Sequence, residues 1–161
     1  MAVLITRRAP GSAPVSVRAV AAMARAMLAE LELDASELSI LLTSDEGIQR
    51  LNREHRGKDR PTDVLSFPQN EFRRPLVPRR GHDLAVLGDV IVSLDTAARQ
   101  ARGRRRPLLD EIRFLLAHGL LHLLGYDHAT PGEKKVMTAR TRALVRAGAR
   151  SSSRSASEIP S

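Results

Sequence analysis

The chain has 161 residues, of which 42% are hydrophobic, so it is long enough for one domain with a substantial core and too short for two comfortable ones. It contains no cysteine, which excludes disulfide bonds and thiolate metal sites. The formal net charge is +8, with 26 Lys and Arg against 18 Asp and Glu, and this excess favours a polyanionic partner such as nucleic acid.

Hydrophobic periodicity predicts an alternation of strands and helices in the first half of the chain. The expected elements are a strand over residues 2–7, a helix over 15–33, a strand over 37–42, a helix from 43 to about 53 and a strand over 64–67. Ser44 or Asp45 is a plausible N-cap for the second helix. Pro68 ends the last of these strands, and residues 69–83, with prolines, four arginines and a glycine, predict an exposed loop.

In the second half, a buried strand is expected over residues 87–94, and a short helix begins at Asp95. A break at 103–107 precedes a helix that Pro107 opens and Gly125 ends. That helix is apolar around most of its circumference and should be buried. A last amphipathic segment is expected from about 133 to 145.

Together these elements predict an α+β fold: a single domain with a mixed β-sheet of about four strands packed with about five helices. The domain is expected to cover residues 1–146, and the Ser-, Arg- and Ala-rich residues 147–161 are expected to form a disordered tail. The sequence has neither a signal-peptide pattern nor an apolar run long enough for a bilayer, so we expect a cytoplasmic protein without a membrane partner.

Three of the five histidines fall within eleven residues, in the run His118-Gly-Leu-Leu-His122-Leu-Leu-Gly125-Tyr-Asp-His128. Residues 118 and 122 lie on one face of a helix, one turn apart, and a left-handed Gly125 lets the chain bring His128 to the same point. A single buried histidine is more often a hydrogen-bonded core residue than a ligand. Three at ligand spacing predict one metal ion, and three nitrogen ligands with one open position suit a catalytic zinc.

The same run resembles the metzincin pattern His-Glu-x-x-His-x-x-Gly-x-x-His at all three histidines and at the glycine. It departs at Gly119, where that pattern has the glutamate that serves as general base of the metalloprotease reaction. The sequence therefore keeps the metal ligands and lacks the base of a peptidase.

Upstream, Arg56, Lys58 and Arg60 alternate with a glycine and an acid in a turn that leads into the strand over 64–67. Such a turn can present guanidinium groups to phosphate. An ordinary solvated turn is the alternative interpretation. Aromatic residues make up only 2% of the chain, so phosphate contacts rather than base stacking should dominate any binding of RNA.

Three segments resemble, in order, motifs of the bacterial YbeY family of ribosomal RNA maturation factors. The segments are Arg56-Gly-Lys-Asp-Arg-Pro-Thr-Asp-Val-Leu-Ser-Phe-Pro68, Leu87-Gly-Asp-Val-Ile91 and the histidine run, and the similarity covers roughly residues 35–140. The resemblance departs at His55, where an aromatic residue is expected.

The resemblance implies a single-strand-specific endoribonuclease, dependent on one zinc ion per chain, that acts in 16S rRNA 3′-end maturation and ribosome quality control. It implies His118, His122 and His128 as metal ligands, and Arg56 and His118 as catalytic residues. The expected partners are rRNA and the small ribosomal subunit with its proteins, and no DNA. Asp89 or Asp127 could orient a ligand histidine, although capping or surface roles are at least as plausible.

Two other functions remain open at this point. A zinc metalloprotease-like hydrolase is suggested by the histidine spacing and opposed by Gly119 and the basic charge. A non-catalytic rRNA-binding assembly factor would use the same histidines for a structural metal.

Overall fold

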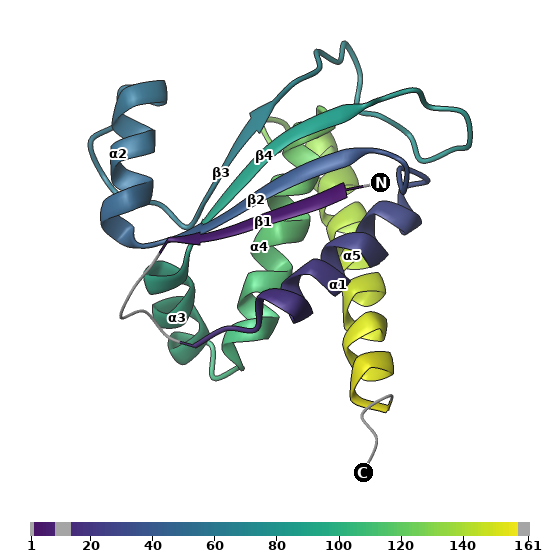
Figure 1. The fold of residues 1–161 in the computed structure, drawn as a ribbon. Coiled ribbons are helices and arrows are strands. Elements are labelled where there is room, and N and C mark those ends of the chain that lie inside the picture. The colour runs from purple at the N-terminus through teal and green to yellow at the C-terminus, as the bar shows by residue number, and fades with distance from the viewer. Residues whose placement is uncertain (1, 9–13, 158–161) are drawn as a thin grey trace.

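The computed structural model describes residues 2–8 and 14–157, which form a four-stranded sheet and five helices (Figure 1). The elements are β1 (Ala2–Arg8), α1 (Val17–Glu30), β2 (Glu37–Thr43), α2 (Asp45–Arg56), β3 (Val64–Pro68), β4 (Val86–Ser93), α3 (Leu94–Gly103), α4 (Leu108–Leu123) and α5 (Pro131–Ser157). Within the described part of the chain, no helix has the length and apolar character needed to cross a membrane.

The sheet has the strand order β1-β2-β4-β3. β1, β2 and β4 are parallel to one another, whereas β3 pairs antiparallel with β4. The expectation of a mixed sheet in a single α+β domain is therefore confirmed. β3 is therefore one of the two edge strands of the sheet.

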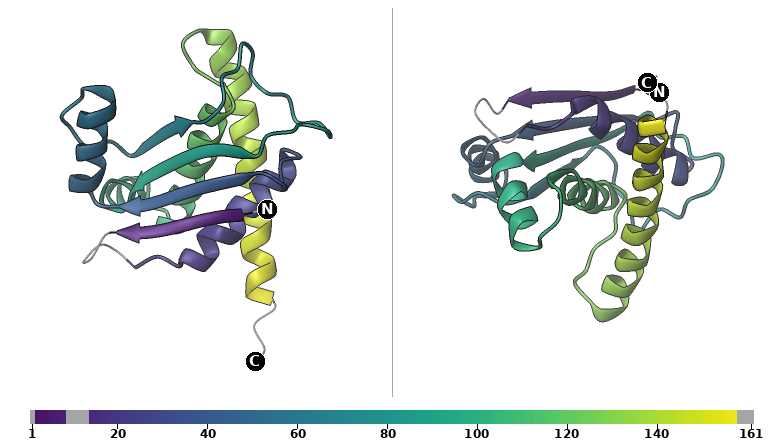
Figure 2. Two further views of the ribbon diagram at one scale, coloured as in Figure 1. Left: turned by 45° about the horizontal axis from the view of Figure 1, so that its top comes forward. Right: turned by 90° about the horizontal axis from the view of Figure 1, so that it is seen from below.

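The two faces of the sheet are covered unequally. α1 and α4 lie against one face, and α5 packs on these two helices (Figure 2). The main core lies on this side of the sheet, and Leu38, Ile40 and Leu42 of β2 are buried in it. The other face carries a small cluster in which Ile48 of α2 packs with Leu65 and Ile91; α2 stands at one end of the sheet (Figure 1). Alternation along β2 sends successive side chains to the two faces.

A polar network anchors the start of α2. Ser44 caps the helix, its hydroxyl accepting a hydrogen bond from the Gly47 N–H at 3.2 Å. The Asp45 carboxylate accepts hydrogen bonds from Ser93 Oγ at 2.7 Å, Thr96 Oγ1 at 2.6 Å and the Arg99 guanidinium at 2.7 Å. This network joins α2 to the junction of β4 and α3, and so fixes the direction in which α2 points.

α5 is longer than expected. It runs past residue 145 to Ser157, so the predicted domain boundary at 146 falls inside a helix, and residues 147–157 are helical rather than a disordered tail. Close packing on α1 accounts for the first part of this extension: Ala147 is buried, and a Cβ on Gly148 would lie 3.0 Å from Met27 Cε. Residues 158–161 of the expected tail lie outside the described residues.

The segment 69–83 is irregular, as expected, but it is not wholly exposed. Leu76 is buried, and Phe72 packs against the main core. The Leu76 N–H donates to the Leu124 carbonyl at 3.0 Å, at the end of α4. The segment is therefore tied to the histidine helix at its middle.

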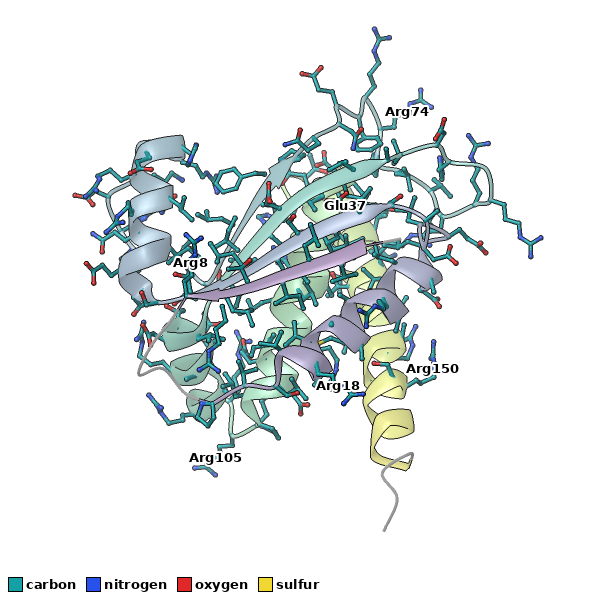
Figure 3. All side chains as sticks on the ribbon, in the orientation of Figure 1. Arg8, Arg18, Glu37, Arg74, Arg105 and Arg150 are labelled. Carbon is teal, nitrogen blue, oxygen red and sulfur yellow. The ribbon has the colours of Figure 1, made fainter. Side chains whose placement is uncertain are left out.

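Positive charge is spread over several elements. Figure 3 shows Arg74 on the segment 69–83, Arg105 after α3 and Arg150 on α5, on separate parts of the surface. All three are exposed. The net charge of +8 is thus a property of the whole surface, and the cations that matter for a site must be identified by their neighbours.

Candidate metal centre and cleft

The three histidines of the sequence motif converge. His118 and His122 lie one turn apart on α4, with their Nε2 atoms 3.1 Å apart. The ring of His128 lies 5.8 Å from that of His118 and 5.5 Å from that of His122, measured between centroids. Each residue offers one nitrogen, and the three nitrogens lie within 4.8 Å of one another.

This arrangement fits a metal ion. Tetrahedral zinc, with Zn–N bonds of about 2.0–2.1 Å, requires nitrogens about 3.3 Å apart. His118 and His122 are already at that separation, so any inward shift falls on His128. His118 and His122 are half-buried and His128 is exposed, which leaves one side of the group open to solvent. Three imidazole donors suit zinc and other transition metals, and they do not suit magnesium or calcium.

The protonation of the two helix histidines also suits ligation. Burial lowers the pKa of His118 below its usual value, and the neighbouring His122 and His128 lower it further. Burial likewise lowers the pKa of His122, with His128 next in effect. Both imidazoles are therefore neutral near pH 7, as metal binding requires.

A tight turn after α4 places His128. Leu124 caps the helix, and Gly125 follows with φ +90°, in the left-handed region expected for it. The Tyr126 hydroxyl, buried, donates to the Leu76 carbonyl at 2.6 Å. The end of α4 is thus held on one side by its own turn and on the other by the segment 69–83.

Close packing against the sheet explains why residue 119 is a glycine. A Cβ at this position would lie 2.7 Å from Val90 Cγ1 and 3.1 Å from Val64 Cγ2, because α4 lies directly against β3 and β4. The Gly119 carbonyl accepts a hydrogen bond from Ser66 Oγ at 2.7 Å. A glutamate therefore has no room where the metzincin pattern requires its general base.

Arg56 shares a cavity with the histidines. It is the last residue of α2, and Gly57, with φ +68°, turns the chain immediately after it. A cavity of about 720 Å³ opens between this turn and the end of α4. It is lined by His55, Arg56, Asp63, Val64, Ser66, Phe67, Pro68, His118, His122, Gly125, Tyr126, Asp127 and His128. We call this cavity the cleft.

The turn that carries Arg56 is organised by a buried amide. Asn52 is buried on α2, and its side-chain N–H donates to the Arg60 carbonyl at 2.9 Å. The Lys58 N–H in turn donates to the Asn52 carbonyl at 3.2 Å. Lys58 and Arg60 stay exposed and do not line the cleft, so Arg56 is the cation of the turn that faces the histidines.

The acidic residues divide between the two faces of the sheet. Asp127 lines the cleft, and its charge acts on His122. Asp89 lines a different cavity on the α2 face, with Leu41 and Ile91, so it cannot orient a ligand histidine. Asp63, which the sequence analysis missed, lines the cleft, and its charge acts on His118. Its place immediately before β3, in the quoted basic-turn motif, was the available signal.

His55 takes over the packing of an aromatic residue. Its ring lies 5.1 Å from the ring of Phe67, tilted by 59°. Phe67 belongs to β3 and His55 to α2, so this contact closes the cleft between the strand and the helix end. The departure from the family pattern at His55 therefore preserves a ring at this point.

Comparison with known proteins agrees with this arrangement. The family model described as "Endoribonuclease YbeY" matches residues 12–148. A protein of that name from Anaeromyxobacter dehalogenans is 48% identical over 147 residues, which are 91% of this chain and 72% of that protein. One from Anaeromyxobacter sp. is 52% identical over 124 residues, or 77% of this chain and 60% of that longer protein.

A solution structure of a protein from Thermotoga maritima superposes with a TM-score of 0.66 at 25% identity. The superposition covers 99% of this chain and 97% of that one. The same fold thus spans the whole length, and the matched segment contains Arg56 and all three histidines. The chain belongs to the YbeY family.

Proposed function

We propose that this protein is a zinc-dependent endoribonuclease specific for single-stranded RNA. The observation that carries the proposal is that Arg56 lines the same cleft as the three histidines, although it is far from them in sequence. The names of the relatives supply the reaction class. We further propose 16S rRNA 3′-end maturation and ribosome quality control as its role, with rRNA, the small subunit and its proteins as partners in the cytoplasm.

His118, His122 and His128 would hold the metal, which would supply Lewis-acid polarisation of a phosphoryl oxygen and would acidify a water. Arg56 binds the scissile phosphate, and its planar guanidinium can donate two parallel hydrogen bonds to the non-bridging oxygens. Those bonds strengthen as negative charge builds on the oxygens during cleavage. Asp63 and Asp127 are the carboxylates of the cleft, and so the candidates for holding the proton that the nucleophile loses.

The two alternative functions are less well supported. A peptidase needs a general base where Gly119 leaves no room for a side chain. A non-catalytic assembly factor with a structural metal needs a closed ligand shell, whereas His128 is exposed and the cleft opens beside the histidines.

Cleavage of a labelled RNA oligonucleotide, single-stranded or annealed to its complement, tests the proposal. We expect the single strand alone to be cut, a chelator to abolish cutting and added Zn²⁺ to restore it. Full activity in chelator would contradict metal dependence. RNA binding without cutting would identify the assembly factor, and hydrolysis of casein the peptidase.

Contaminating ribonucleases can imitate the expected result. The control is the His118→Ala variant, purified in the same way, which should bind little metal and cut no RNA. Equal cutting by this variant would refute the proposal.

A further inference from the structure

A second cavity, of about 550 Å³, lies on the other side of the histidines, between α4 and α5. We call it the α5 cavity. His118 and His128 line both this cavity and the cleft, so the two meet at the metal centre. Phe114 of α4 forms a further part of one wall, and α5 forms the opposite wall. A strand bound in the cleft therefore lies within reach of the α5 cavity across the rings of His118 and His128.

The walls suit a flat, largely apolar group. Phe114 is half-buried, and its ring is stacked with that of His118, with centroids 6.1 Å apart and planes at 25°. Met137 and Val145 line the α5 side. Thr138 adds an exposed hydroxyl that can donate or accept a hydrogen bond. A planar ring with polar edges matches these groups.

The rim of the α5 cavity is basic. Lys134, Arg142 and Arg146 line it, all three are exposed, and none has a carboxylate within 4.0 Å among the described residues. Arg104 and Arg106 do not line the cavity: both pair with Glu111, and their guanidinium carbons lie 5.9 and 5.7 Å from the Phe114 ring centroid. Among the described residues that line the cavity, none is acidic. An apolar slot with a rim of unpaired cations fits a base flanked by phosphates.

Resting on the proposed endoribonuclease function, we propose that the α5 cavity binds one nucleobase of the single-stranded RNA substrate, next to the scissile phosphate. The base packs against Phe114 and Met137, and Arg142 contacts a neighbouring phosphate. Arg56 lies in the cleft, on the other side of the histidines, so the metal centre stands between the base-binding and phosphate-binding parts of the site. Although aromatic residues are few, Phe114 is half-buried and lines the cavity, where a base can contact the exposed part of its ring.

The test is a set of single-stranded RNA oligonucleotides that lack one base at successive positions, each cut by the zinc-loaded full-length protein. Loss of the base that occupies the cavity should raise KM by about 5- to 150-fold, the range expected for one stacked base, with little change in kcat. Loss of a base several positions away should change neither constant. An equal KM at every position would overturn the proposal.

Filling the cavity should remove this dependence. In Thr138→Trp the exposed position tolerates a large side chain that occupies the slot, so the intact oligonucleotide should bind as weakly as the one lacking the critical base. If Thr138→Trp kept the wild-type dependence, the assigned cavity would be wrong.

A charge reversal provides a second variant that does not disturb the core. Arg142→Glu should weaken RNA binding and flatten its salt dependence, whereas Lys135→Glu, the same charge change on an exposed residue of α5 outside the cavity, should have a smaller effect. Equal effects of the two variants would contradict a specific role for the rim.

Binding measured by fluorescence anisotropy separates this proposal from the proposed function. If the protein cuts no RNA but its affinity still depends on one base and on Thr138, the cavity assignment stands and the nuclease assignment falls. If it cuts RNA but its affinity depends neither on one base nor on Thr138, the nuclease assignment stands and the cavity assignment falls.

Discussion

The two walls of the cleft are held in place by different forces. α4, which carries two of the metal ligands, is enclosed by the core, with Leu116, Leu120 and Leu121 among its fully buried residues. α2, which ends at Arg56, buries only Ile48 and Asn52 and is held by the small cluster around Ile48 and by polar contacts. A metal site needs fixed distances, and close packing supplies them. A phosphate-binding side chain such as Arg56 must be accessible from solvent, and its place at the exposed end of α2 leaves it accessible.

Removing a ligand from the buried wall should have the largest effect. His118→Ala should lose most of its bound metal and all detectable RNA cleavage, because two nitrogens do not hold the ion as three do. Metal analysis per chain and the cleavage assay check this. His82→Ala is the matched control: His82 lies outside the cleft, bonded to the Val77 carbonyl, and should keep one ion per chain. Full metal content in His118→Ala would show that the ion binds elsewhere.

On the exposed wall, Arg56→Ala should lower kcat by about 10²- to 10³-fold, the loss seen when one charge-stabilising donor is removed. Metal content and thermal stability should stay unchanged, since Arg56 is exposed. Arg53→Ala, in the same last turn of α2 but outside the cleft, should keep its activity. If Arg56→Ala lost its metal, the two walls would not be independent.

Close packing can be tested at Gly119. Gly119→Ala should lower the free energy of unfolding by about 1–3 kcal/mol, because its Cβ would lie 2.7 Å from Val90 Cγ1. Gly132→Ala, in α5 with open space around it, should be neutral or stabilising by up to about 1 kcal/mol. Denaturant unfolding of both variants gives the comparison, and a stabilised Gly119→Ala would mean that α4 can move away from the sheet.

The smallest effect concerns the polar anchor of α2. Burial alone would raise the pKa of Asp45, but the hydrogen bonds from Thr96, Ser93 and Arg99 and the charge of Arg99 bring the pKa below its usual 3.8. Because the folded-state pKa is the lower one, the carboxylate contributes stability above about pH 4, and this contribution is lost as the pH falls through the folded-state value.

Asp45→Asn should therefore be destabilised by about 1 kcal/mol at pH 7, and the gap to the wild type should narrow as the pH falls below 4. Unfolding at a series of pH values measures the gap. A gap of constant size would show that the charge of Asp45 does not hold α2.

The sequence predicted the local structure well wherever the hydrophobic periodicity agreed with the capping, proline and glycine residues that begin and end helices and strands. The expected helix over 15–33 is α1 (Val17–Glu30), and Ser44 caps α2 as expected. The histidine geometry was predictable because a four-residue spacing and one glycine determine it. The convergence of Arg56 on the histidines required the family resemblance, since it depends on how β3 is placed in the sheet.

Other features depend on tertiary contacts that no local pattern contains. β3 could not be assigned as the antiparallel edge strand from its composition. The extension of α5 depends on the fit of Ala147 and Gly148 against α1, although their surroundings in sequence are polar. The sequence left the choice between Asp89 and Asp127 open, because the side to which a strand residue points depends on the register of β4 with its neighbours.

The contact between Tyr126 and Leu76 divides the segment 69–83 into two separate loops. Because the Leu76 backbone is bonded on both its N–H and its carbonyl, each half has its own fixed end points. Insertions or deletions within 77–83 can then change the outer loop without moving His128, whereas a change of length within 69–75 displaces Leu76, which holds Leu124 and Tyr126 close to His128 in the chain. Across relatives, length variation should therefore be tolerated after Leu76 and be rare before it.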